Sequence, residues 1–101
     1  MKEESLEDLR QFFGAYFHQD WIDDAQEPDE IVERFLADRP DPQSRVQLAR
    51  LMEEYAATAK DDEALEQALF SELWCYYTPS ADGLRAGDWI RHIAALLRAI
   101  E

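Results

Sequence analysis

The residues best suited to chemistry lie together between Gly14 and Trp21, which reads Gly-Ala-Tyr-Phe-His-Gln-Asp-Trp. His18 and Asp20 within it are the pair that a small hydrolase would use as a base and its carboxylate partner. No nucleophile in a recognisable elbow and no glycine-rich phosphate loop accompanies this pair. We therefore expect no enzymatic activity and no catalytic residue, with His18 serving as a hydrogen-bonded structural residue.

Metal and cofactor sites are also not expected. A zinc site requires several His or Cys ligands, and the other candidates, Cys75 and His92, lie far from His18 without a metal-binding spacing. A calcium loop requires a glycine at its sharp turn, and residues 20–30 contain none. The sequence thus predicts neither a bound metal nor a cofactor.

Acidic residues dominate the chain, which has 23 Asp and Glu against 10 Lys and Arg and a formal net charge of -13. This excess argues against direct binding to nucleic acid or to an anionic membrane, and it favours a basic protein partner. The densest run of acids comprises Asp20, Asp23, Asp24, Glu27, Asp29, Glu30 and Glu33. We expect Asp23, Asp24, Glu27 and Glu30 to contact that partner. The alternative is a solvated surface at two helix N-termini.

The apolar spacing predicts an all-α fold, a single-domain bundle of four or five helices over residues 1–101. A Ser5–Asp8 capping box is expected to start the first helix, and residues 21–27 are expected to form a loop or a short helical turn. Asp41 and Asp61 are expected to cap two later helices. The remaining predicted starts are Pro28, Pro42 and, for a last helix reaching Ile100, Ala86.

The predicted core is aromatic and comprises Phe13, Tyr16, Phe17, Trp21, Phe35, Leu69, Trp89 and Ile93. A second aromatic group, Trp74, Tyr76, Tyr77 and Trp89, is interpreted as core packing with polar tips at the rim. The single cysteine, Cys75, excludes an internal disulfide and suits a small core position. The N-terminus lacks the apolar core of a signal peptide and no apolar run could span a bilayer, so a cytoplasmic protein is expected.

Two segments resemble the immunity proteins of bacterial contact-dependent growth inhibition systems. One is Gly14–Trp21; the other runs from Cys75-Tyr76-Tyr77 through Pro79 and Asp82-Gly83-Leu84 to Trp89-Ile90. The chain departs from the family pattern at Ala86-Gly87-Asp88, where relatives more often carry an aromatic residue and a Glu. The resemblance assigns a structural signature to Tyr16, Phe17, His18, Gln19, Asp20, Trp21 and Trp89.

The resemblance implies a cytoplasmic protein that binds and blocks the C-terminal domain of its cognate toxin, with no small-molecule substrate. Many such toxins are nucleases with basic clefts, which suits the acidic charge of this chain. The alternative is an acidic nucleic-acid mimic or regulator that occupies a basic protein. A large secreted-toxin gene immediately upstream would favour the immunity protein over the mimic.

Overall fold

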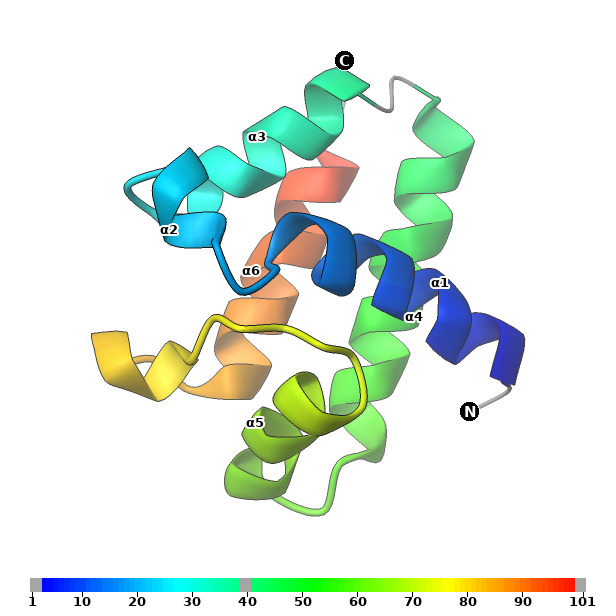
Figure 1. The fold of residues 1–101 in the computed structure, drawn as a ribbon. Helices are drawn as coiled ribbons and strands as arrows, with labels where there is room; N and C mark the ends of the chain where they lie inside the picture. Colours follow the sequence, from blue (N-terminus) through cyan, green and yellow to red (C-terminus); the bar gives the residue numbers. More distant parts are fainter. Residues whose placement is uncertain (1–2, 39–40, 100–101) are drawn as a thin grey trace.

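The computed structural model describes residues 3–38 and 41–99 and is built from helices joined by short connections (Figure 1). In chain order the elements are α1 (Glu3–Tyr16), α2 (Trp21–Asp24), α3 (Pro28–Asp38), α4 (Pro42–Thr58), α5 (Asp62–Ser71), the 3₁₀ turn η1 (Pro79–Asp82) and α6 (Ala86–Arg98). No strand occurs in this described part of the chain, so the all-α prediction is confirmed. Six α-helices replace the expected four or five, because the predicted turn after Trp21 forms the four-residue α2.

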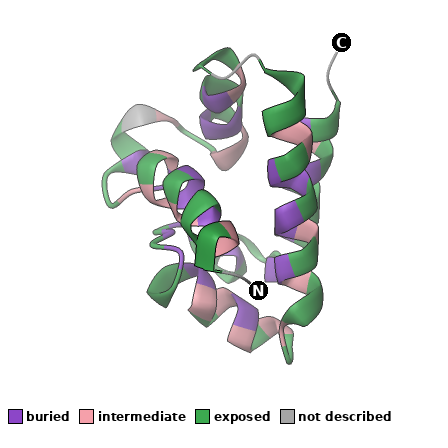
Figure 2. Ribbon diagram, turned by 90° about the vertical axis from the view of Figure 1, so that its right-hand side faces the viewer, coloured by how far each residue is buried: buried purple, intermediate pink, exposed green. Residues whose placement is uncertain are grey.

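Helix α6 is the centre of the bundle, since it packs against α3, α4, α5 and η1. Its buried residues recur at helical spacing, so that one side of the helix is entirely enclosed: Ala86, Gly87, Trp89, Ile90, Ile93, Ala94 and Leu97. Helix α1 crosses in front and contacts α3 and α4 (Figure 1). The buried residues of each helix face inward, and the outer faces are exposed (Figure 2). The last helix ends at Arg98, and residue 100 lies outside the described part.

Two of the predicted helix caps are confirmed. The Asp41 carboxylate accepts the backbone N–H of Gln43 at 3.2 Å, and the Asp61 carboxylate accepts that of Ala64 at 2.8 Å. Each side chain thereby satisfies an amide that has no partner within its own helix. The predicted start at Ser5 is wrong, because α1 already includes Glu3 and places Ser5 inside the helix.

The core contains nearly every residue predicted for it. Seven of the eight side chains are buried, and Tyr16 is partly buried with its hydroxyl donating to Asp38 at 3.0 Å. Cys75 is also buried, as predicted, and this burial raises the pKa of its thiol to about 12. The interpretation of the second aromatic group is half wrong: Tyr77 and Trp89 are buried, whereas Trp74 and Tyr76 are exposed.

Candidate protein-binding site

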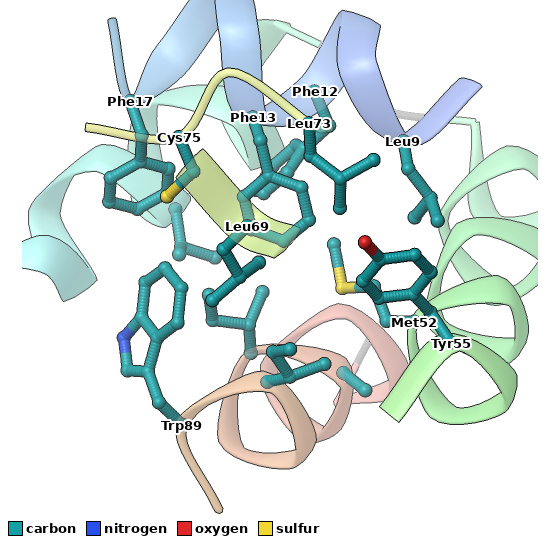
Figure 3. Close-up of a cluster of buried hydrophobic side chains, with 14 of the residues drawn as sticks. Leu9, Phe12, Phe13, Phe17, Met52, Tyr55, Leu69, Leu73, Cys75 and Trp89 are labelled. Atoms are coloured by element: carbon teal, nitrogen blue, oxygen red, sulfur yellow. The ribbon is translucent and has the colours of Figure 1, made fainter. Parts of the chain in front are cut away.

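The two sequence segments that resemble the immunity family meet in the core. Phe17, from the first segment, lies with its ring centroid 5.3 Å from that of Trp89 and 6.2 Å from that of Tyr77, both in the second segment. Trp21 packs edge-on against Tyr77 at 5.5 Å. Figure 3 shows Phe17 and Trp89 facing each other from opposite sides of this cluster. These side chains hold the α1–α2 turn against the start of α6.

His18 and Asp20 form a local turn. The backbone N–H of Asp20 donates to His18 Nδ1 at 3.1 Å, so this ring nitrogen acts as an acceptor. The Asp20 carboxylate makes no capping hydrogen bond to α2 and lies at the surface, as does Gln19. Asp20 therefore adds its charge to the neighbouring acidic surface.

The predicted contact residues occupy α2 and the start of α3. The side chains of Asp23, Glu27 and Glu30 are exposed. Asp24 belongs to the same short helix as Asp23, and its side chain lies outside what the structure describes. This arrangement presents Asp23 and Glu27 to solvent close to a helix N-terminus that already carries acids in its first turn.

Glu30 has a structural task that the sequence analysis did not identify. Its Oε1 accepts the backbone N–H of Gln26 at 2.7 Å and that of Glu27 at 3.2 Å. Glu27 precedes the first residue of α3, so Glu30 is the third helical residue reaching back to the cap, as in a capping box. The Glu30 side chain thus caps the start of α3 through its oxygen, and its charge adds to the surface field.

A groove beside these acids joins distant parts of the chain and is here called the acidic groove. It has a volume of about 430 Å³ and is lined by Glu27, Pro28, Asp29, Tyr77, Asp82, Leu84, Asp88, Trp89 and His92. The four carboxylates are those of Glu27, Asp29, Asp82 and Asp88. The apolar wall consists of Tyr77, Trp89, Leu84 and Pro28. Such a combination suits the aliphatic stem and the charged head of a lysine or arginine side chain.

Hydrogen bonds fix the acids of the acidic groove. The Tyr77 hydroxyl donates to Asp82 at 2.7 Å, and burial together with this carboxylate raises the pKa of Tyr77 well above its usual range. His92 Nε2 lies 3.0 Å from a carboxylate oxygen of Asp29. Asp88 pairs with Arg91 at 2.9 Å. The Tyr77 hydroxyl is a neutral partner, so it leaves the charge of Asp82 uncompensated, whereas Arg91 offsets the charge of Asp88.

Trp89 leaves a donor without an acceptor in this region. Its side chain is buried, yet the indole Nε1–H has no hydrogen-bond partner. Figure 3 shows that nitrogen on the edge of the ring that points away from the other labelled core side chains. A buried donor without a partner costs free energy.

Comparison with known proteins identifies the family. A family model described as CdiI immunity protein matches residues 5–97. The chain belongs to the CdiI immunity protein family. The match includes both resembling segments and the acidic middle of the chain. No curated protein and no solved structure matches the sequence.

Family membership makes a toxin protein the partner, as members neutralise the toxins of contact-dependent growth inhibition systems. In the described part of this immunity protein, no cluster of His, Cys, Asp or Glu could hold a metal ion. Among the same residues, no helix has the length and apolar character needed to cross a bilayer.

The sequence analysis missed three residues of the acidic groove, namely Asp82, Asp88 and His92. Asp82 was named only as part of the second segment that resembles the family, and the structure places its carboxylate against Tyr77. Asp88 and His92 are four residues apart, a spacing that puts both on the same face of α6. That spacing could have predicted that Asp88 and His92 lie together, but nothing in the sequence indicated that Asp29 would lie opposite His92.

Proposed function

We propose that this immunity protein neutralises a toxin domain that is a nuclease, and that it acts by binding. The family supplies the toxin as partner. The nuclease character rests on charge: a nuclease must hold phosphate, so its cleft carries Lys and Arg side chains. An inhibitor with a net charge of -13 is matched to such a cleft.

One observation carries the proposal, which is the convergence of carboxylates from two distant segments on the acidic groove. Glu27 and Asp29 come from the start of α3, whereas Asp82 and Asp88 come from η1 and α6. Their fields add with those of the exposed Asp23 and its neighbours. A concentrated field of one sign accelerates association with a basic partner, and added salt weakens this effect.

Asp23, Asp24 and Glu27 are the proposed direct contacts, with Glu30 contributing through its charge and through the shape of the α3 start. A contact that becomes buried and hydrogen-bonded against a toxin cation would cost about 2–5 kcal/mol of binding free energy on truncation. A contact left at the rim would cost much less. Binding takes place in the cytoplasm and involves the C-terminal toxin domain, without nucleic acid, membrane or cofactor.

Co-production with the cognate toxin domain tests the proposal. We expect the two proteins to copurify as a stable complex and the producing cells to survive. The purified toxin domain should cleave RNA or DNA, and addition of this protein should abolish that cleavage. A toxin domain that binds but cleaves no nucleic acid would refute the nuclease assignment, and absence of any complex would refute toxin binding.

A further inference from the structure

The segment between α5 and η1 alternates strictly between buried and exposed residues. Leu73, Cys75 and Tyr77 point inward, and Trp74 and Tyr76 point outward. Hydropathy alone does not reveal this alternation in the sequence, because the exposed Trp74 and Tyr76 are aromatic like the buried Tyr77. Two rings of one short segment are therefore presented to solvent.

Three exposed aromatic residues of this part of the chain, Phe70, Trp74 and Tyr76, are here together called the aromatic face. These side chains are 56%, 57% and 45% exposed. Phe70 and Tyr76 pack edge-on with ring centroids 5.1 Å apart. Large aromatic residues grouped at a surface indicate a binding site, since Trp and Tyr are enriched among residues that dominate interface energetics.

The backbone of Trp74 has a strained conformation. Its φ angle is +61°, in the left-handed region that bulky residues avoid. Strain of this kind persists where the surrounding structure enforces it, and it is concentrated at functional sites. A glycine would adopt this angle without strain, so the tryptophan is present despite its conformational penalty.

Helix α1 supports the exposed indole. A Cβ atom at Gly14 would lie 3.3 Å from Trp74 Cε3, so the glycine lets the ring lie close to the helix. The Arg10 guanidinium lies 5.7 Å from the ring centroid of Trp74, and its Nε donates to the backbone carbonyl of Glu72 at 2.8 Å. Trp74 is thus pre-organised while more than half of it remains accessible.

The rim of the aromatic face is anionic. Arg10 is shared by two carboxylates, Glu3 at 3.0 Å and Glu7 at 3.6 Å, which leaves an excess of negative charge beside the indole. The Arg10 guanidinium already lies over the indole, so a cation supplied by a partner would pair with Glu3 and Glu7 beside the ring. A second copy of this chain carries the same charge of -13 and would be repelled.

We infer that the aromatic face is a recognition surface for the toxin, and that a basic patch of the toxin packs on these rings with its Lys or Arg side chains beside Glu3 and Glu7. This inference rests on the proposed function, because the toxin is its occupant. Residues 73–77 connect the two surfaces along the chain, since Tyr77 lines the acidic groove while Trp74 and Tyr76 belong to the aromatic face.

The test is calorimetric titration of the purified cognate toxin domain with Trp74→Gly, Phe70→Ala and Tyr76→Ala. Trp74→Gly should fold with a melting temperature close to that of the parent, because glycine tolerates the positive φ. Its affinity should fall by about 30-fold or more, as expected for an interface anchor. Phe70→Ala and Tyr76→Ala, neither of which holds a positive φ, should each weaken binding by about 10-fold. Val46→Ala on α4 is the control and should change affinity by less than about 3-fold.

Three results would overturn the inference. The first is a Phe70→Ala/Tyr76→Ala double variant that folds and binds the toxin as tightly as Val46→Ala does. The second is a parent protein that sediments as a dimer which Trp74→Gly dissociates, since the occupant would then be a second copy. The third is a parent protein that does not bind the toxin at all, which would refute the proposed function as well; the first result would leave that function intact.

Discussion

At the scale of single residues, Asp62 connects two helices through one carboxylate. It is the first residue of α5, yet its oxygens accept the backbone N–H groups of Ala86 and Gly87 at 2.8 and 2.9 Å. These amides open α6, whose own N-cap residue, Arg85, makes no side-chain cap. The hydrogen bond from Gly87, followed by that from Ala86, lowers the pKa of Asp62 below its usual range.

Replacing Asp62 should therefore weaken the fold in a pH-dependent manner. Asp62→Ala is expected to lower the free energy of unfolding by about 1–2 kcal/mol at neutral pH, as for loss of a helix cap. Because the folded pKa lies below the unfolded value of about 3.9, the stabilisation is present above that pH and is lost as the pH falls through the folded pKa. Thermal unfolding of the parent and variant across this range measures the difference, which should shrink in acid. A difference that stays constant into strong acid would contradict the charged cap; Glu63→Ala is the control.

Phe17 is the residue that joins the two family segments in the core. Its side chain is fully buried and packs against Trp89, Trp21 and Tyr77. Phe17→Ala should lower the free energy of unfolding by about 3–5 kcal/mol through lost burial and the resulting cavity. Phe70→Ala removes the same group from an exposed position and should cost about 0.5 kcal/mol or less. Equal losses for the two variants in urea unfolding would show that this core assignment is wrong.

At the scale of elements, the start of helix α3 contains a residue with two tasks: it belongs to the proposed binding surface and it also caps the helix. Glu30 caps the start of this helix while lying in the acidic segment. If the charge of Glu30 were reversed, a weaker interaction with the toxin could result either from the lost binding contact or from the lost helix cap. A glutamine keeps the oxygen acceptor and removes only the charge.

Glu30→Ala and Glu30→Gln should consequently differ in stability. The alanine variant is expected to lose about 1 kcal/mol of unfolding free energy, because the amides of Gln26 and Glu27 lose their acceptor. The glutamine variant should remain within about 0.5 kcal/mol of the parent. Chemical denaturation of both proteins, with the exposed Glu33→Ala as control, provides the measurement. An alanine variant as stable as the glutamine variant would exclude the capping role.

Local patterns were sufficient to predict most elements but not their arrangement. Asp41 and Asp61 were predicted as caps, because a capping side chain bonds to an amide within its own first turn. The cap that Asp62 places on α6 and the contact of His92 with Asp29 span the fold, so no local pattern indicates them. Trp74 was misassigned to the core because its exposure depends on a positive φ that residue type disfavours.

At the scale of the whole molecule, the fold brings dispersed acids to one side of the bundle. The sequence predicted the acidic segment at α2 and α3, and the structure adds Asp82 and Asp88 from the other end of the chain. Helix α6 makes this possible, since it packs against both α3 and η1. The total charge can be counted from the sequence, whereas the acidic groove can be located only once the packing of the helices is known.

The central claim is that toxin recognition depends on this placement of charge and not on net charge alone. Two double variants separate the alternatives, because they change the net charge by the same amount. Asp23→Lys/Glu27→Lys alters the acidic surface, whereas Glu4→Lys/Glu54→Lys alters exposed positions on α1 and α4. Both replace exposed side chains that make no cap or core contact among the interactions described above.

The most direct measurement is the association rate of each double variant with the cognate toxin domain, at low and at high salt. We expect Asp23→Lys/Glu27→Lys to associate at least about 10-fold more slowly than Glu4→Lys/Glu54→Lys at low salt, with the difference diminishing at high salt. Circular dichroism spectra should show both variants folded. Equal association rates for the two folded variants at low salt would contradict the account, because the toxin would then respond only to the total charge.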